Sequence, residues 1–193
     1  EQVLADGCAD MVSMARPLLA DAAVVKKAAQ GRADRINTCI ACNQACLDHV
    51  FQNKTSSCLV NPSACHETEL VYRPVTAPSS RKRIAVVGAG PAGLTAATVA
   101  AERGHEVHLF DAAAAIGGQL NMAKVVPGKE EFHEMLRYLA TRVQDTGVHL
   151  HLNQRVQAAD LMDYDEVVIA TGVEPRDAQI PGQDHPKVLS YID

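Results

Sequence analysis

The stretch Ile84-Ala85-Val86-Val87-Gly88-Ala89-Gly90-Pro91-Ala92-Gly93 joins an apolar run directly to three glycines. The apolar run predicts a buried strand, and the alanine-rich residues after it predict a helix to about Arg103, which Gly104 ends. A second strand is expected at 106–110, and it closes on Asp111, 18 positions after Gly93. A G-x-G-x-x-G motif between a strand and a helix, with an acidic residue ending the next strand, is typical of a dinucleotide-binding βαβ unit.

Each residue type in this motif has a physical task. Gly88 permits a tight turn, Gly90 lets the backbone approach a pyrophosphate, and Gly93 allows the helix to pack on the strand. The helix N-terminus at Pro91-Ala92 then faces the negative charge. Asp111 can accept hydrogen bonds from ribose hydroxyls, which favours an unphosphorylated ribose and hence FAD or NAD. The alternative is a glycine-rich turn that binds no nucleotide.

The rest of this half continues the α/β pattern. Ile116-Gly117-Gly118-Gln119-Leu120 places two glycines where backbone amides can approach a ligand. A helix is expected from Lys129 to about Asp145, because its apolar positions repeat at i, i+3, i+4 and i+7. Arg137 falls off that stripe, which predicts a solvated side chain. Further strands are expected at 148–152, in a short segment around Val156, and at 165–170, the last one buried and ending at Thr171-Gly172.

A second informative stretch is rich in cysteine. Cys39, Cys42, Cys46 and Cys58 have the spacing C-x2-C-x3-C-x11-C. Three thiols so close in sequence cannot all pair with one another, but with the fourth they complete the ligand set of a [4Fe–4S] cluster. The alternatives are a zinc ion in a closed four-cysteine site and a set of ordinary buried thiols.

The remaining two cysteines are interpreted differently. Cys65-His66 is predicted to be structural, because adjacent residues seldom both reach one ion and the four-thiol set is already complete. Cys8 is predicted to be a core thiol. Asp48-His49-Val50-Phe51 is expected to continue the cysteine stretch as a helix or turn, and Asn61-Pro62 to break the chain.

The first residues predict one βα unit. A helix end at 3–6 stops at Gly7, a short buried strand follows at 10–14, and Pro17 is the first residue of a helix to about Gln30. In a (β/α)8 barrel, the loops after the last strands and a nearby helix N-terminus form a phosphate site. Arg16 lies where such a phosphate would be bound, although an arginine before a helix is commonly just solvated.

These patterns divide the chain into four parts. We expect the C-terminal βα end of a TIM barrel at 1–36, an iron–sulfur segment at 37–73, a linker at 74–82 and a partial Rossmann-like FAD-binding domain at 83–193, so the fold class is α/β. The sequence starts as if inside a helix and ends abruptly, which predicts an internal piece of a longer protein.

Composition narrows the function. Hydrophobic residues make up 47% and charged residues 21%, which is typical of a globular chain. A net charge of −5 without a large basic block argues against nucleic acid as a main partner. The uncharged run 84–101 is interrupted by three glycines, a proline and two threonines, so we interpret it as part of a soluble protein and not as a membrane span. Metal-ligand spacing of four of the six cysteines favours a reducing cytoplasm over disulfides.

Taken in order, these motifs resemble the bacterial NADPH-dependent 2,4-dienoyl-CoA reductases. These reductases belong to a larger group of enzymes that combine an Old Yellow Enzyme-like barrel, a [4Fe–4S] cluster and a flavoprotein module, and trimethylamine dehydrogenase belongs to the same group. The cysteine spacing is closer to that of the dienoyl-CoA reductases. The Ala170-Thr171-Gly172 strand end also resembles the FAD-binding half of two-dinucleotide flavoprotein reductases. The resemblance is carried by the stretches 10–17, 39–48, 86–93, 127–132 and 185–190.

The resemblance implies roles for the matched positions. Ala15 and Arg16 would hold an FMN phosphate, and the four cysteines would ligate the cluster. The implied FAD contacts are Gly90, Pro91, Ala92, Asp111, Gly118, Gln119, Arg137 and the backbone of Val156.

The implied activity is an electron relay. NADPH would reduce FAD, the cluster would pass single electrons to FMN, and reduced FMN would reduce an unsaturated acyl-CoA during fatty acid oxidation. The acyl-CoA site, its proton donor and the NADPH domain lie outside this sequence, so no catalytic residue is assigned and the piece alone is expected to be inactive. Two alternatives stay open: another substrate, such as an enoate, enone or amine, or a zinc-stapled nucleotide-binding module used for interaction.

Overall fold

The structure is a computed structural model that describes residues 2–190 and 192. It divides into two compact units. The first consists of Glu1–Arg73 together with Glu131–Thr141, and the second of Pro74–Glu130 together with Arg142–Asp193. None of the helices in residues 2–190 combines the length and apolar character that a membrane crossing requires.

The first unit is built from short helices and loops. Its elements are α1 (Gln2–Ala5), α2 (Arg16–Ala20), α3 (Val24–Ala29), the 3-10 helix η1 (Ala33–Arg35) and α4 (Leu47–Phe51). Gly7 follows α1 with a φ of 67°, in the left-handed region that favours glycine at a helix end. The helix end before Gly7 and the helical continuation of the cysteine stretch are therefore confirmed.

Two expectations for this unit are wrong. Residues 10–14 form no strand and are largely exposed, with Met11 83% exposed. A five-residue apolar run becomes a strand only where a neighbouring strand pairs with it, and no described segment does so. The helix expected from Pro17 to Gln30 is broken at Asp21, whose Oδ1 accepts a hydrogen bond from the Ala23 amide at 3.0 Å. An aspartate that bonds the nearby backbone in this way competes with the helix.

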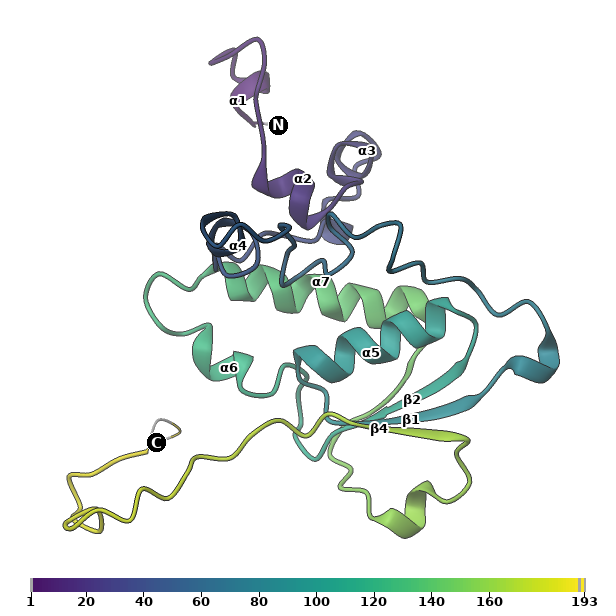
Figure 1. Cartoon of the computed structure of the whole chain (residues 1–193), viewed down its shortest axis with the longest axis vertical. Coiled ribbons are helices and arrows are strands. Elements are labelled where there is room, and N and C mark those ends of the chain that lie inside the picture. Colours follow the sequence, from purple (N-terminus) through teal and green to yellow (C-terminus); the bar gives the residue numbers. More distant parts are fainter. Residues whose placement is uncertain (1, 191, 193) are drawn as a thin grey trace. The chain divides into compact units, whose positions relative to one another are not determined.

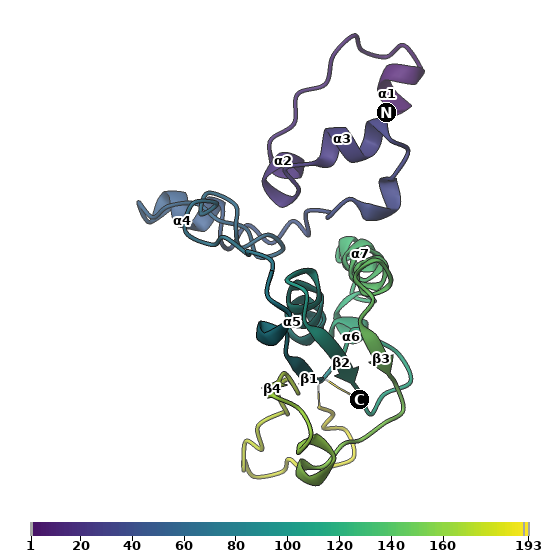
Figure 2. The same ribbon diagram turned by 90° about the vertical axis from the view of Figure 1, so that its right-hand side faces the viewer.

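The second unit contains a four-stranded parallel sheet. Its strands are β1 (Arg83–Val87), β2 (Glu106–Phe110), β3 (His149–His151) and β4 (Glu166–Ile169), in the order β3-β2-β1-β4. Figure 2 shows this order across the sheet. The direction of strand order reverses at β1, and in open parallel sheets ligands bind at the carboxyl ends of the strands at such a point.

Helix α5 (Pro91–Glu102) covers one face of this sheet (Figure 1). Its Leu94 and Ala97 are fully buried, as are Val86 of β1 and Leu109 of β2. These side chains form the centre of the core. The other elements are the 3-10 helices η2 (Pro78–Ser80) and η3 (Ala158–Leu161), α6 (Leu120–Ala123) and α7 (Glu131–Thr146). The parallel sheet confirms the α/β class. The strands and helices predicted from the glycine motif onward are confirmed to within a few residues, except for the short segment around Val156.

The opposite face carries a cluster of histidines. His108 of β2 pairs in register with His149 of β3, and His108 Nδ1 lies 3.0 Å from His151 Nε2. The Glu106 carboxylate is 3.0 Å from His108 Nε2, and the Tyr164 ring packs edge-on against His108 at 5.4 Å. Burial raises the free energy of the charged imidazole and so lowers the pKa of His151, and the charges of the two neighbouring histidines lower it further.

Three other details differ from expectation. Val156 lies in no strand, and β4, expected to be buried, has exposed side chains along its whole length. It pairs only with β1 and forms the edge of the sheet. Cys8 is exposed, not a core thiol, because it follows the turn at Gly7 outside any packed element.

Candidate cofactor sites

The glycine-rich turn after β1 is closely packed on one side. A Cβ at Gly93 would lie 1.8 Å from the Gly88 carbonyl oxygen, and one at Gly88 would lie 2.2 Å from the Ala170 carbonyl oxygen. Gly88 also has a φ of 109°, which side chains rarely tolerate. Gly88 and Gly93 therefore let the strand, the turn and α5 pack closely together. Their role is to allow the fold and so to give the site its shape.

Gly90 lies on the open side of the same turn. A Cβ there would meet nothing within 4 Å, and Gly90 is the N-cap residue of α5, which has no side-chain cap. The first amides of the helix, starting after Pro91 with Ala92, are therefore directed at free space. Gly118 lies beside this space, because its Cβ would be 3.3 Å from the Gly90 Cα. The result is a cradle without side chains at a helix N-terminus, which fits a pyrophosphate.

Asp111, which directly follows β2, is hydrogen-bonded to the turn that follows β1. Its Oδ2 accepts a hydrogen bond from the Ala89 amide at 2.6 Å, and its Oδ1 accepts one from the Ala113 amide at 2.7 Å. A carboxylate has about four lone-pair sites, so about two remain available to ribose hydroxyls. Asp111 therefore holds the glycine-rich turn in place and can still accept from a nucleotide.

Gln119 and Val156 lie on the segments that surround this cradle. The Gln119 side chain donates to the Val173 carbonyl oxygen at 2.6 Å, and the Gly117 amide donates to the Ala89 carbonyl at 2.7 Å. Val156 is half-buried, and the nearby Gln154 amide donates to the Asp111 carbonyl at 2.9 Å. The chain thus gathers the segments of the predicted FAD contacts at one edge of the sheet, while Arg137 belongs to the first unit.

The four predicted cluster ligands line one pocket in the first unit. Cys39, Cys42, Cys46 and Cys58 are among the residues that line a pocket partly open to solvent, and all four thiols are free. Burial raises the pKa of the Cys58 thiol, and the charges of Cys39 and Cys42 raise it further. Loops 39–46 and 58 are thus brought together without any disulfide.

Backbone conformation around the pocket is strained. Ala41 and Asn43, inside the cysteine motif, have φ values of 53° and 59°. The left-handed conformation costs an alanine about 1–2 kcal/mol, and such strain is concentrated at functional sites. It turns the Ala41 amide toward the Cys39 sulfur at 3.4 Å, and the amides of Val60 and Asn61 bond the Cys58 sulfur. Amide groups directed at sulfur stabilise thiolates.

The four sulfurs share a pocket but do not converge on one point. In residues 2–190 and 192, no three His, Cys, Asp or Glu side chains are placed to hold a single metal ion. A zinc site needs four sulfurs about 2.3 Å from one atom. A [4Fe–4S] cluster binds each thiolate to a different iron and so separates them. The donor set of four cysteine thiols is the one that a [4Fe–4S] cluster requires, and a closed zinc site uses the same set.

Ala15 and Arg16 are placed next to this pocket. Arg16 is the first residue of α2 and lines the pocket with the cysteines, together with Leu19. Ala15 is the N-cap residue of α2, and its carbonyl accepts from the Leu19 amide at 3.2 Å. The structure thus brings together the predicted cluster ligands and the residue predicted to bind a phosphate. Of the other cysteine motif, Cys65 is exposed, and His66 pairs with Glu69.

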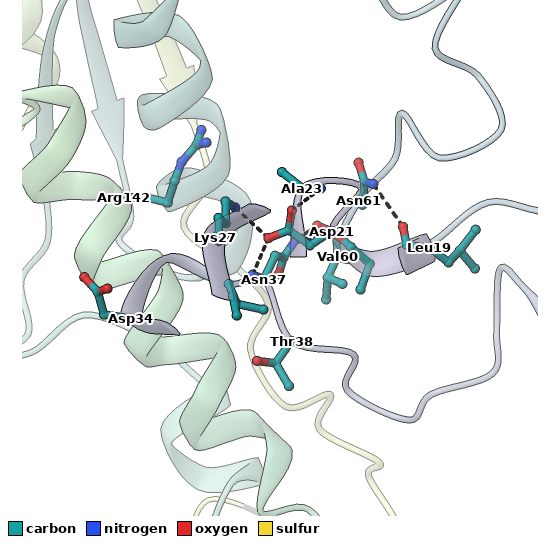
Figure 3. Close-up of polar contacts among 12 residues, drawn as sticks. Leu19, Asp21, Ala23, Lys27, Asp34, Asn37, Thr38, Val60, Asn61 and Arg142 are labelled. Atoms are coloured by element: carbon teal, nitrogen blue, oxygen red, sulfur yellow. Dashed lines mark hydrogen bonds and ion pairs between the residues drawn. The ribbon is translucent and has the colours of Figure 1, made fainter. Parts of the chain in front are cut away.

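Sequence reasoning missed a buried polar clamp that holds the two ends of the cysteine segment. Asn37 is 6% exposed, and its side-chain amide donates to the Ala20 carbonyl at 3.2 Å and to the Val60 carbonyl at 2.7 Å. Its backbone amide donates to Asp21 Oδ2 at 2.9 Å, which Lys27 also contacts at 2.5 Å (Figure 3). We call Asp21, Asn37 and Asn61 the asparagine clamp.

Asn61 completes this clamp by donating to the Leu19 carbonyl at 3.0 Å (Figure 3). The carbonyls at the end of α2 are therefore bound by one asparagine before Cys39 and another after Cys58. The sequence around Asn61-Pro62 predicts only a break in the chain. The signal that could have found the clamp is the presence of asparagines flanking the outer cysteines, a residue type that commonly bonds backbone groups.

Comparisons with known proteins agree with this arrangement. Residues 82–193 match the pyridine nucleotide-disulphide oxidoreductase family. The chain is 40% identical over 199 residues to the metal reductase of Desulforamulus reducens, which covers 100% of this chain and 29% of the reductase. A solved 2-naphthoyl-CoA reductase in complex with 2-naphthoyl-CoA superimposes with a TM-score of 0.93 at 35% identity, over 100% of this chain and 29% of that one. Histamine dehydrogenase from Rhizobium sp. 4-9 superimposes with a TM-score of 0.82 at 30% identity. The match covers 93% of this chain and 27% of the dehydrogenase chain.

The chain thus spans less than a third of the length of each of these relatives. Its likeness to the two solved structures extends from the cysteine segment through the sheet. Both units therefore occur together in oxidoreductases.

Proposed function

The chain belongs to the pyridine nucleotide-disulphide oxidoreductase family, and from that premise we propose that it is the iron–sulfur and FAD-binding part of a flavoprotein reductase. The observation that carries this proposal is the four-cysteine pocket, in the same chain as an open glycine cradle at a helix N-terminus. One site suits a dinucleotide, and the other suits a cluster that exchanges single electrons.

The cradle residues have distinct tasks in this proposal. Gly90, Ala92 and Gly118 would leave backbone amides free for the pyrophosphate of FAD, and Asp111 would accept from the ribose while it holds the turn. The acceptor of hydride from a nicotinamide nucleotide would be FAD, and the cluster would supply one-electron transfer. The chain's own contribution is to bind and orient both groups.

The cysteine pocket has a further consequence for a bound cluster. Amide groups of Ala41, Val60 and Asn61 are directed at cysteine sulfurs and would stabilise negative charge there. Hydrogen bonds to sulfur are one of the factors that set the potential of such clusters. Arg16, which lines the pocket, adds a positive charge beside it and, with Ala15, is our proposed phosphate contact for FMN.

For the substrate class, we propose reduction of a conjugated C=C bond in an acyl-CoA, such as a 2,4-dienoyl-CoA, with NADPH as the reductant. What supports this is the likeness to 2-naphthoyl-CoA reductase across the whole of this chain, together with the sequence resemblance to dienoyl-CoA reductases. The likeness to histamine dehydrogenase favours amine oxidation as the second candidate. A cytoplasmic location is part of the same proposal.

The first experiment is an anaerobic visible spectrum of the purified chain, with iron, sulfide, zinc and flavin quantified on one sample. About four irons and four sulfides per chain, with a broad absorbance band, are expected for the proposed cluster. Stoichiometric zinc without iron or sulfide would replace the electron-transfer proposal by a structural zinc site. Flavin is measured separately, because the piece can bind the cluster without FAD.

Two serine variants provide the matched comparison. Cys46→Ser removes a residue that lines the pocket, whereas Cys65→Ser removes an exposed thiol outside it. We expect iron and sulfide to fall sharply in the first variant and to remain unchanged in the second. Equal loss in both would show that the metal is not held by the four-cysteine pocket.

The substrate proposal requires the longer parent protein. Anaerobic NADPH oxidation is measured with a 2,4-dienoyl-CoA and with a simple enone. Oxidation of histamine is measured separately, with an artificial electron acceptor in place of NADPH. The proposal predicts the highest kcat/KM with the dienoyl-CoA. Turnover of the amine alone would establish the second candidate instead.

A further inference from the structure

Arg137 makes a set of contacts that its expected role in FAD binding does not explain. It lies on α7, in the stretch Glu131–Thr141 that belongs to the unit with the cysteines. Its Nη1 donates to the Asp34 carbonyl, and its Nη2 donates to the Ile36 carbonyl at 3.0 Å. Nη2 also lies 3.5 Å from the Thr38 hydroxyl. All three contacted residues lie within the five positions before Cys39.

The donor count of the guanidinium is informative. Arginine has five N–H groups in a fixed planar fork. Besides the three contacts above, Arg137 Nε donates to the Glu134 carboxylate at 2.7 Å. Four of the five N–H groups are therefore directed at groups of this chain, which leaves one for a ligand. An arginine that clamps a flavin pyrophosphate would need two parallel donors.

The contacted carbonyls explain why an arginine is required. η1 ends at Arg35, and the carbonyls of Asp34 and Ile36 lie at its C-terminal end, where helices leave carbonyl groups without backbone partners. A single planar fork can bind both carbonyls and reach Thr38. An ammonium group has no such fork and could not satisfy the three at once.

We propose that Arg137 is a positioning residue of the cysteine pocket and not a flavin ligand. It fixes the segment 34–38 and so determines where Cys39 lies, and its positive charge at Thr38, the neighbour of Cys39, favours the more negative state of the bound cluster. The effect of the charge on the cluster rests on the proposed function. The positioning of segment 34–38 concerns the chain alone.

The experiment compares variants of the full 193-residue chain. Arg137→Gln removes the charge and the fork, and Arg137→Lys keeps the charge but not the fork. The matched control is Arg142→Gln, on the same helix, where Arg142 pairs with Glu102 at 2.8 Å in the second unit. Hydrogen exchange is measured for peptides covering 34–42, and the cluster potential is measured by anaerobic redox titration.

We expect amide exchange in 34–42 to become about tenfold faster in both Arg137 variants, as loss of hydrogen bonds to the backbone predicts. The midpoint potential should become more negative in Arg137→Gln and be largely restored in Arg137→Lys. The control should change neither quantity.

The outcomes separate the two proposals. A wild-type chain that binds no iron overturns the proposed function, while the exchange measurement still decides whether Arg137 positions the segment. Unchanged exchange in Arg137→Gln overturns the positioning role. If that variant also loses FAD, the residue is a flavin contact as the sequence resemblance implied.

Discussion

Two substitutions at Asn37 test whether the asparagine clamp holds the cysteine segment. Asn37→Leu keeps most of the side-chain volume and removes the amide donors to Ala20 and Val60. Asn37→Asp keeps the shape and turns the two donors into an acceptor facing the same two carbonyls. In both variants the backbone amide can still donate to Asp21.

The magnitudes follow from the contacts. Each lost hydrogen bond lowers the free energy of unfolding by roughly 1 kcal/mol. Asn37 Oδ1 is buried without a partner among the described residues, so Asn37→Leu also removes a buried acceptor whose unpaired state is unfavourable. We therefore expect a net loss of about 1–2 kcal/mol for this variant. Asn37→Asp adds a buried charge close to the Asp21 carboxylate, which raises the expected loss to roughly 3–5 kcal/mol at pH 8.

The loss in Asn37→Asp should depend on pH. Burial and the Asp21 carboxylate raise the pKa of the introduced carboxyl group above its unfolded value of about 3.9. The folded state then binds the proton more tightly than the unfolded state, so stability falls as pH rises through this window. A protonated carboxyl can also donate to the Val60 carbonyl. The variant should therefore be closer to wild type at pH 5 than at pH 8.

Hydrogen exchange with mass spectrometry is the appropriate assay, because the chain has two units and local opening is what the clamp prevents. Peptides covering 18–24 and 58–64 report the two segments that Asn37 joins, and peptides of β1 and β2 serve as internal controls. Protection factors, which correct for the roughly tenfold rise of intrinsic exchange with each pH unit, are compared. Equal protection factors in the two variants at pH 8, or the same protection factors at pH 5 and pH 8 in Asn37→Asp, would refute the reasoning about the clamp.

Further predictions concern the second unit. Gly93→Ala should destabilise it by about 3 kcal/mol, because the new Cβ meets the Gly88 carbonyl at 1.8 Å, whereas Gly90→Ala should cost less than about 1 kcal/mol and mainly weaken FAD binding. Urea unfolding and flavin titration of both variants check this pair, and equal effects of the two on folding would contradict it. His151 has a lowered pKa, chiefly through burial, so the unfolded state binds its proton more readily and stability should fall as pH drops below 6.5. His151→Gln should flatten this dependence in urea unfolding between pH 5 and 8, and an NMR titration that places the pKa of His151 above 6.5 would show the sign to be wrong.

Much of the sheet could be predicted from the sequence because its signals are local. The apolar run 84–87, the glycines after it and Asp111 define a strand, a turn and the end of the next strand within one short stretch. The helix α7 could likewise be predicted from the spacing of its own apolar residues. Residues 10–14 have the same apolar character as β1 yet form no strand, because a strand also requires a neighbour that its own sequence does not specify.

The candidate site divides in the same way. The cysteine spacing identified four residues that the structure gathers around one pocket, and their role as ligands stays a prediction. Arg137 was predicted to be solvated from its helical position, and to contact FAD from resemblance. Its hydrogen bonds to Asp34 and Ile36 connect residues about 100 positions apart, which no periodicity could indicate.

These long-range contacts explain why the motif alone does not make the pocket. The segment from Cys39 to Cys58 could keep the same cysteine spacing in many loop conformations, and roughly 1–2 kcal/mol of backbone entropy opposes each residue that is fixed. Asn37 and Asn61 hold the ends of the segment on α2, which begins at Arg16, and Arg137 holds the approach to Cys39. Spacing therefore supplies the candidate ligands, whereas these three side chains hold the segment that carries them.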